Sequence, residues 1–181
     1  NIDERQVLSQ SAAAALGRKT DQLIIDVLDA GSNANNVVHG SAGLTLAKAL
    51  TVYESFGAAD VPDDGQRYFV VSPAGWADLL QIDQFSRAEY VGEADLPYAG
   101  GLTAKRWLGF MWFTHSGLSK ASTTRDCHAY HKSAVGVAMG SDIRTEINYI
   151  PEKVSNLITS YMSLGVVEID GNGMIECQIT E

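Results

Sequence analysis

The sequence predicts an α+β fold, in which a long helix precedes a mixed α/β layer and further strands. Three observations lead to this prediction. Residues 3–30 place apolar side chains at steps of three and four, the spacing of a helix. Residues 60–80 indicate a turn, a buried strand and a capped helix in direct succession. Residues 143–150 alternate between apolar and polar side chains, as a half-exposed strand does.

The first predicted helix covers residues 3–30. Its alanine-rich run favours a helix, whereas Gly17 weakens it and Gly31 is a natural stop. Because the apolar positions form a stripe, we interpret this helix as one that packs on a core rather than one that binds a cofactor. The stripe consists of Leu8, Ala12, Ala15, Leu16, Leu23, Ile24, Val27 and Leu28.

A polar segment rich in Gly and Asn, residues 32–43, predicts a loop and a domain boundary. A second helix is expected over residues 44–56, and Gly57 ends it. The side chains predicted to share its buried face are Leu46, Ala49, Leu50 and Tyr53.

Residues 60–80 form the centre of the predicted α/β layer. The Asp63-Asp64-Gly65 run favours a turn, and residues 68–71 form a short apolar strand. Ser72 is a good helix cap, and Pro73 suits the first helical position because its missing N–H would have no partner there. The side chains expected on the buried face of that helix, with Trp76 as the anchor, are Trp76, Leu79 and Leu80.

The second half of the chain predicts mostly strands. Residues 107–114 alternate and include four large aromatic side chains, Trp107, Phe110, Trp112 and Phe113, which indicates one strand. Residues 119–124 indicate a polar turn. Residues 126–138 indicate two strands around a turn near Lys132-Ser133.

The final segment predicts a helix and a hairpin. Pro151 is expected to open the helix, and Gly165 to stop it. Asp170-Gly171-Asn172-Gly173, between the apolar runs 166–169 and 174–179, indicates a β-hairpin. The apolar face of the predicted helix consists of Val154, Leu157, Ile158, Tyr161 and Met162.

Composition limits the function. The 181 residues suffice for one or two small domains with a hydrophobic core. The net charge of −9 argues against a free-standing nucleic-acid-binding protein, although it allows a container whose wall faces DNA. No apolar run is long enough to span a membrane, so no membrane partner is expected. Cys127 and Cys177 form no CxxC pair, which favours a reducing compartment.

The residues predict no catalytic, cofactor-binding or metal site. Cys127, His128 and His131 are the one cluster of metal-type ligands, and on a strand Cys127 and His131 face one way while His128 faces the other. A zinc site or a Cys/His nucleophile is therefore not expected. The Asp63-Asp64 pair is interpreted as turn chemistry, because nothing places a base beside it.

The segment DVPDDGQRYFVVSPAGWADLL, residues 60–80, resembles the central segment of tailed-bacteriophage major capsid proteins with the Hong Kong 97-type fold. Those proteins often show a helix ending in Val-Pro, an acidic turn with Gly, Arg-Tyr, an apolar strand, Ser/Thr-Pro and an amphipathic helix. Later segments follow the same order: Gly109-Phe110 opens a strand, and His131-Lys132-Ser133-Ala134-Val135-Gly136 follows. The resemblance covers most of the chain and rests on this ordered set.

The resemblance implies a Hong Kong 97-type fold with a long spine helix, peripheral-domain β-strands and a mixed α/β axial domain. Residues 1–36 and 125–150 would form the peripheral domain. Residues 37–124 and the helix and hairpin of residues 151–181 would form the axial domain. The family's N-terminal arm and extended loop lie upstream of the spine helix and are absent from this chain, so autonomous assembly of this chain is not expected.

By the same resemblance, the chain would be a major capsid protein subunit and not an enzyme. Identical copies would form pentamers and hexamers that close into an icosahedral shell around phage DNA. The expected partners are further copies of the chain, a scaffolding protein, a portal and non-specifically packaged DNA. The expected location is the virion capsid, with the host cytoplasm during assembly, and no cofactor is expected.

Residues 83–105 are too long for an ordinary connection, and loops of this length are usually functional or disordered. A shell protein would use such a loop to touch its neighbours, whereas an enzyme would use it as a lid. Exposed tyrosines and an acidic edge that faces a basic edge of the next copy suit a subunit contact. The expected contact residues are Tyr90, Glu93, Asp95, Leu96, Tyr98, Lys105 and Arg106.

Two alternatives remain at this point. A bacterial nanocompartment shell protein of the encapsulin type shares the capsid fold but encloses protein cargo instead of DNA. A small α/β enzyme with a lid at residues 83–105 is the alternative from another class, and no constellation of residues supports it.

Overall fold

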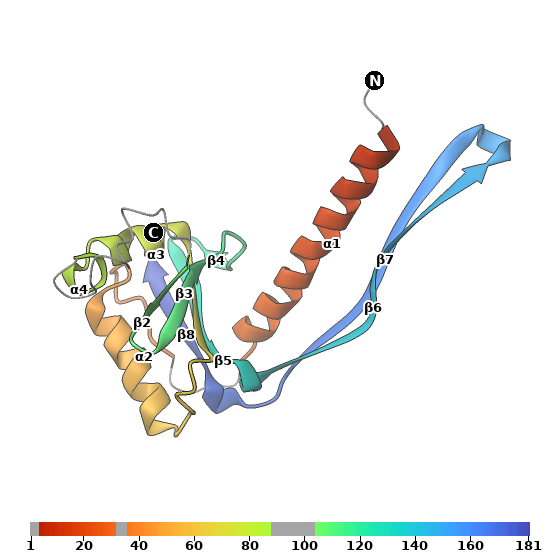
Figure 1. Cartoon of the computed structure of the whole chain (residues 1–181). Helices are drawn as coiled ribbons and strands as arrows, with labels where there is room; N and C mark the ends of the chain where they lie inside the picture. Colours follow the sequence, from red (N-terminus) through yellow and green to blue (C-terminus); the bar gives the residue numbers. More distant parts are fainter. Residues whose placement is uncertain (1–3, 32–35, 88–103) are drawn as a thin grey trace.

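A computed structural model of the chain describes residues 4–31, 36–87 and 104–181. Figure 1 shows two parts, a sheet with short helices around it and two long elements that project from it. The first projecting element is helix α1 (Glu4–Asp29), and the second is a β-hairpin formed by β6 (Val135–Ile150) and β7 (Ser155–Glu168). We refer to the first part as the sheet body and to the β6–β7 hairpin as the arm. The predicted α+β class is confirmed.

The sheet body is organised around strand β1 (Arg67–Val71), as the sequence predicts for residues 68–71. The strand lies between β3 (Phe110–Thr114), with which it is parallel, and β5 (Thr124–His131), with which it is antiparallel. The sheet order is β2-β3-β1-β5-β4, and β8 (Met174–Thr180) also pairs with β5. The remaining strands are β2 (Ala104–Trp107) and β4 (Lys120–Ala121).

The two faces of β1 are covered by different helices, which explains its unbroken apolar sequence. Phe69 stacks on Trp112 with ring centroids 4.0 Å apart, and both side chains are fully buried in the core cluster that includes residues of α2 (Leu46–Ala58) and α3 (Pro73–Leu80). Val70 lies on the opposite face, beneath the C-terminal half of α1. The sheet is therefore buried on both sides at its centre.

The predicted cap of α3 is confirmed. The Ser72 hydroxyl accepts a hydrogen bond from the Gly75 N–H at 3.0 Å, and Pro73 occupies the start of the helix. Trp76 is only partly buried and meets the Phe85 ring edge-to-face, whereas Leu79 is fully buried. Leu79, not Trp76, is thus the innermost side chain of α3. Helix α4 (Asp83–Ser86) follows and carries Phe85.

The predicted buried face of α2 is only partly correct, because Ala49 is buried and Leu46 is partly buried, but the other two predicted residues are not. The buried side chains of the helix are Lys48, Ala49, Val52 and Phe56, whereas Leu50 and Tyr53 are exposed. The apolar side chains of α2 occupy two stripes, and only one of them can face the sheet. The structure buries the stripe that ends in Phe56, which meets Phe110 edge-to-face.

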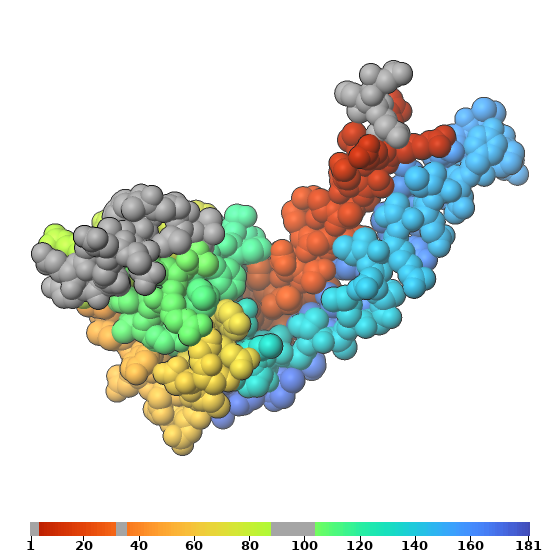
Figure 2. All heavy atoms as spheres, in the orientation of Figure 1, coloured from red at the N-terminus to blue at the C-terminus, as the bar shows by residue number. Residues whose placement is uncertain are grey.

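The long predicted helix is confirmed as α1, but only its C-terminal half is anchored in the core. Ile25 and Leu28 are its buried residues. The same half of α1 also runs beside β7, where the Thr20 hydroxyl lies 3.5 Å from the Met162 sulfur. The N-terminal half exposes Val7 and Leu8. Figure 2 shows α1 and the arm as neighbouring extensions of the same molecule.

The predicted helix after Pro151 is wrong, because residues 155–168 form strand β7. Only a three-residue 3₁₀ turn, η3 (Pro151–Lys153), follows the proline. The partly buried positions of β7 alternate with exposed ones, so Ile158 and Met162 share a face because they are an even number of residues apart. A spacing of four residues fits both a helix and a strand, and the pairing with β6 shows that this segment is a strand.

Two further strand predictions need correction. Residues 107–114 are not one strand, because Leu108 and Gly109 have positive φ and form a tight turn between β2 and β3. The Asp170-Gly171-Asn172-Gly173 turn is a 3₁₀ turn, η4 (Gly171–Gly173), and does not close a hairpin. β7 pairs with β6 before this turn, whereas β8 pairs with β5 after it. The predicted turn near Lys132-Ser133 is confirmed as η2 (Lys132–Ala134).

Within the described residues, no helix is both long enough and apolar enough to cross a membrane.

We predict that Phe69→Ala costs more stability than Trp76→Ala. Phe69 is fully buried against Trp112, so its loss should lower the free energy of unfolding by about 3–5 kcal/mol. Trp76 is partly exposed, so Trp76→Ala should lower the free energy of unfolding by less than Phe69→Ala does. Urea unfolding of both variants measures the difference, and equal losses would show that the face of α3 is misassigned.

Candidate functional site

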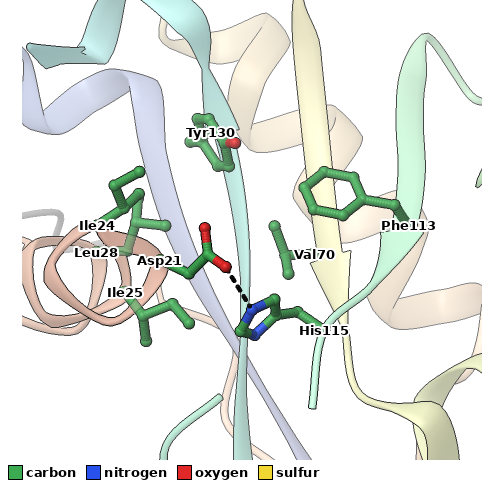
Figure 3. A pocket seen from close by; sticks show the side chains of 8 residues that line it. All are labelled: Asp21, Ile24, Ile25, Leu28, Val70, Phe113, His115 and Tyr130. Carbon is green, nitrogen blue, oxygen red and sulfur yellow. Dashed lines mark ion pairs between the residues drawn. The ribbon is translucent and has the colours of Figure 1, made fainter. Parts of the chain in front are cut away.

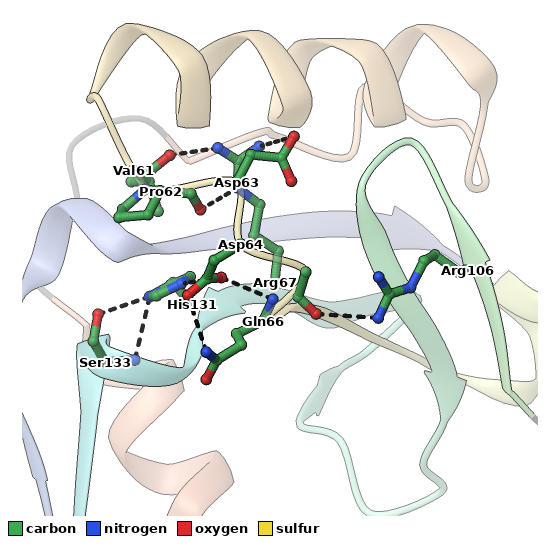
Figure 4. Close-up of polar contacts among 10 residues, drawn as sticks. Val61, Pro62, Asp63, Asp64, Gln66, Arg67, Arg106, His131 and Ser133 are labelled. Carbon is green, nitrogen blue, oxygen red and sulfur yellow. Dashed lines mark hydrogen bonds and ion pairs between the residues drawn. The ribbon is translucent and has the colours of Figure 1, made fainter.

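The described residues form polar clusters at the places where elements of the chain meet. The first lies at the start of β1, where the Arg67 side chain is buried. Its guanidinium donates to the carbonyl oxygens of Val61 and Pro62, the latter at 3.0 Å from Nε. Figure 4 shows these contacts, which fix the connection between α2 and β1. The charge also lies over the rings of Phe56 and Phe110, at 5.7 and 5.9 Å.

His131 connects the same turn to the end of β5. Its Nδ1 accepts a hydrogen bond from the Ser133 N–H at 3.3 Å, so Nε2 donates to the Asp64 carboxylate at 3.0 Å. The hydrogen bond from His131, with that from the Gln66 N–H, lowers the pKa of Asp64. Asp63 reaches the Arg67 guanidinium at 3.8 Å. The acidic turn therefore connects the start of β1 to the end of β5.

A second cluster joins the end of α1 to the sheet body. His128 Nε2 lies 2.8 Å from the Asp29 carboxylate, and the Ser119 hydroxyl donates to the other oxygen of Asp29. His128 is buried on the α1 side of β5, next to the partly buried carboxyl of Asp126. Burial opposes ionisation of Asp29, but the bonds from His128 and Ser119 outweigh it and lower the pKa of that carboxyl.

A cavity of about 170 Å³ lies one turn further along the same interface. Figure 3 shows that Ile24, Leu28 and Val70 point into it from helix and sheet, with Tyr130 and Phe113 at its sides. Asp21 and His115 close one end, 3.6 Å apart. The lining is mostly apolar and offers one acid and one imidazole. We interpret the cavity as imperfect packing beneath α1, because a ligand site would need more converging polar groups.

The root of the arm is held by a small apolar cluster of Leu28, Ala134 and Met174. Gly173 passes close by, and a Cβ at this position would lie 2.8 Å from the Cβ of Ala134. The Ile169 N–H donates to the Ala134 carbonyl at 2.8 Å, where the chain returns from the arm. The end of α1, the start of the arm and the start of β8 therefore meet at one point.

The predicted division of Cys127, His128 and His131 between two faces agrees with their contacts. Cys127 packs in the core, where burial raises the pKa of its thiol to about 12, and the same holds for Cys177 opposite it on β8. His128 and His131 bind different aspartates. In the part of the chain that the structure describes, no three His, Cys, Asp or Glu side chains are grouped to hold a metal ion.

The predicted contact loop lies mostly outside the described residues. Tyr90, Glu93, Asp95, Leu96 and Tyr98 fall within residues 88–103, so their expected role stays a prediction.

At the end of the predicted loop, Lys105 does not fit an exposed contact. Its side chain is only 4% exposed, and its ammonium group donates to the Phe85 carbonyl and lies over the Phe85 ring. Arg106 is exposed and donates to the Gly65 carbonyl at 3.2 Å. Of the two basic residues, only Arg106 presents a charge at the surface.

Two exposed apolar surfaces were missed by the sequence interpretation. The first is the outer stripe of α2, where Leu50 is 45% exposed and Tyr53 43%. The signal was present, because Leu50 and Tyr53 recur at helical spacing beside the buried stripe of Val52 and Phe56. The second group of exposed apolar side chains lies on the arm, on both faces of its sheet. Its exposed apolar side chains are Val137, Met139, Ile143, Ile147, Tyr149, Leu157, Tyr161 and Val167.

The family model described as "Phage capsid protein" matches residues 1–181. A comparison with curated proteins finds no match.

Among solved structures, a chain of Mycobacterium phage Che8 is similar, with a TM-score of 0.73 and 21% identity over 94% of this chain and 61% of that one. The capsid structure of cyanophage P-SCSP1u gives a TM-score of 0.69 and 17% identity, over 100% of this chain and 67% of that one. A virus-like particle from Pyrococcus furiosus gives a TM-score of 0.55 and 13% identity, over 90% of this chain and 64% of that one. At these identities the likeness concerns the fold, and this chain spans about three fifths of the Che8 chain.

We predict that Arg67→Met lowers the free energy of unfolding by about 2–5 kcal/mol, because it leaves the buried Val61 carbonyl and the partly buried Pro62 carbonyl without their donor. Arg106→Met serves as the control, since that side chain is exposed and its loss should cost about 0.5 kcal/mol or less. Urea unfolding followed by circular dichroism compares them. If Arg67→Met loses no more stability than Arg106→Met, then Arg67 does not anchor the connection between α2 and β1.

We predict that Asp29→Asn lowers the free energy of unfolding by about 1–3 kcal/mol near neutral pH. Because the folded chain lowers the pKa of Asp29 from 3.8, its ionised form stabilises the fold above that value. That contribution is lost as the pH falls through the lower, folded pKa. The difference between variant and parent should therefore narrow below about pH 4. Asp21→Asn is the control, because the Asp21 side chain is exposed, and it should change the free energy of unfolding little at any pH. A loss of stability in Asp29→Asn that does not depend on pH would contradict the stabilising role of the ionised Asp29 carboxylate.

Proposed function

The chain belongs to the phage capsid protein family, and from this premise we propose that it is the major capsid protein subunit of an icosahedral shell that encloses phage DNA. The observation that carries the proposal is the match of the family model to the whole of residues 1–181. The chain has the Hong Kong 97-type fold, with a long helix beside a mixed sheet. Copies of the subunit form pentamers and hexamers, and these close into the shell.

The two parts of the molecule correspond to the two domains of such a subunit. The sheet body, with α2, α3 and α4, is the axial domain that faces the capsomer centre. Helix α1 and the arm form the peripheral domain. This assignment differs from the sequence prediction in two segments: β5 belongs to the sheet body because it pairs with β1, and residues 155–168 belong to the arm because they pair with β6.

Contacts between axial domains use the outer stripe of α2 and the segment after α4. Leu50 and Tyr53 offer apolar surface that has no partner among the described residues of the same chain, and Tyr is a residue type that interfaces favour. The acidic and aromatic residues proposed for the loop, Glu93, Asp95 and Tyr98, lie close to Arg106 in the sequence. Opposite charges on the two edges would set the register between neighbours.

The same proposal includes the partners of a phage shell. A scaffolding protein and a portal take part in assembly, which occurs in the host cytoplasm, and the packaged DNA is contacted without sequence preference. The chain has no catalytic role, because the polar clusters of the described residues connect elements of the fold. A net charge of −9 suits a wall that does not hold DNA tightly.

A nanocompartment shell is the second candidate. The fold alone does not separate the two functions, because a virus-like particle from Pyrococcus furiosus shares it with the phage capsids. The family model favours the phage capsid. Genes for a portal, a terminase and a protease beside this one would support the capsid, and a gene for a cargo protein in their place would support the compartment.

We predict that Leu50→Ser combined with Tyr53→Ser in the complete gene product reduces the yield of capsomers and shells by at least about tenfold, because a combined loss of about 1.4 kcal/mol per contact already weakens association tenfold. Both side chains are exposed, so circular dichroism should be unchanged. Glu54→Ser, on the same helix beside the stripe, is the matched control. Sizing and negative-stain microscopy compare the three proteins. Normal shells from the double variant would remove α2 from the proposed contacts.

A further inference from the structure

The arm is a sheet of only two strands, and α1 leaves part of it open. Helix α1 lies mainly along β7, where Thr20 reaches Met162. On the same face of the sheet, the side chains of β6 stay exposed, with Met139 62% and Ile147 46% exposed. In the described part of the chain, β7 is the one strand that pairs with β6, so the other edge of β6 has free backbone groups. Long open edges of this kind are templates for pairing with another strand.

The middle of β6 has a self-complementary sequence, Ile143-Arg144-Thr145-Glu146-Ile147. Ile143, Thr145 and Ile147 lie on the α1 side: Ile143 lines a cavity with Thr20, and Thr145 bonds Ser160 at 2.8 Å. Arg144 and Glu146 lie on the other side, where Glu146 accepts from the Tyr161 hydroxyl at 2.9 Å. Both charged side chains are exposed.

If two copies of this segment run antiparallel about Thr145, each residue meets its complement. Arg144 of each copy lies opposite Glu146 of the other, which gives two pairs of opposite charge on one face. Ile143 lies opposite Ile147 on the other face, which gives two apolar pairs. Cross-strand pairs of both kinds stabilise a sheet, and like charges at the same positions destabilise it. A shift of register by one residue would lose both sets of pairs.

We propose that β6 pairs antiparallel with β6 of a second copy of this chain, about a two-fold axis at Thr145. The proposal rests on the proposed shell function and adds a specific contact to it. Closed rings of subunits are built by head-to-tail contacts, whereas a contact between identical segments lies on a two-fold axis. The β6 contact therefore joins subunits of two different rings, and the α2 surface acts within one ring.

The irregularity of β6 limits how far this pairing extends. The register with β7 shifts between Met139 and Ser141 and again between Ser141 and Arg144, so β6 carries bulges on that side. From Arg144 to Ile150 the register is regular. Bulges disrupt a ladder locally and bend the strand. The pairing is thus short and centred on Thr145, which makes it a weak contact that many copies in a shell would reinforce.

Cross-linking at the axis tests the pairing. Thr145→Cys places a thiol opposite its own copy, and mild oxidation with copper phenanthroline should give at least about tenfold more disulfide-linked dimer than Thr159→Cys. Thr159 is a fair control, because it is exposed on β7 directly beside Glu146. The native thiols do not interfere, since Cys127 and Cys177 are fully buried. Equal cross-linking of the two variants would overturn the proposal.

Charge exchange tests the symmetry of the contact. Arg144→Glu alone and Glu146→Arg alone should each abolish the cross-link at Thr145→Cys, because each pairs like charges twice. A mixture of these two proteins should restore it, and so should the double variant that carries both changes. Glu54→Arg, on α2, should leave it unchanged. Cross-linking that is insensitive to all of these changes would show that Thr145 meets its copy by chance collision and would overturn the proposal.

Microscopy of the complete gene product separates this inference from the proposed function. Shells that form from the Thr145→Cys protein without a cross-link on oxidation would overturn the β6 contact and leave the shell function standing. A specific cross-link in a protein that never forms rings or shells would support the contact and count against the shell function.

Discussion

The contact between the partly buried Asp29 and the buried His128 joins the end of α1 to the sheet body. It lies at the end of α1, one residue from Leu28, which packs with Ala134 and Met174 at the root of the arm. Helix, arm and sheet body are therefore fixed to one another within a single small region. The Ser119 hydroxyl also donates to the Asp29 carboxylate, so two elements of the sheet body, β5 and the segment before β4, hold the end of α1.

A fixed joint matters because the proposed function depends on the relative positions of surfaces. A shell closes only if each copy presents its contacts at nearly the same angles, and both proposed contacts lie far from the joint, on α2 and on β6. The clusters at Arg67 and His131 fix positions within the sheet body in the same way. They hold the turn before β1 against the end of β5. Among the described residues, the buried side chains of Arg67, His128 and His131 each connect neighbouring elements of the fold.

The sequence predicted the elements whose signals are local. Helix α1, the cap at Ser72 and strand β1 depend on propensity, capping and apolar runs, and all are present. Strand β7 was mistaken for a helix because Ile158 and Met162 are four residues apart, a spacing that serves a helix and a strand equally. Its pairing with β6 decides the matter, and that pairing is a long-range property. The turn at Asp170-Gly171-Asn172-Gly173 was recognised, but local chemistry does not say which strand the chain meets next.

The candidate surfaces were harder to predict for a related reason. The sequence shows two apolar stripes on α2, and only the packed structure reveals that the Leu50 stripe is the exposed one. Lys105 was expected to belong to a basic edge that meets a neighbouring copy, yet its position beside Phe85 gives it a buried carbonyl partner. The family resemblance came from an ordered set of motifs, which is information about relatives that the physics of a single chain does not contain.

Cryo-electron microscopy of the particles formed by the complete gene product tests the central claim most directly. The account predicts closed shells built of rings of five and six subunits, with the sheet body of each copy around the ring axis and the arm at the ring periphery. Within each copy α1 should keep its contact with β5 through Asp29 and His128. Particles in which the arm lines the ring axis, or a product that stays monomeric under all assembly conditions, would contradict it.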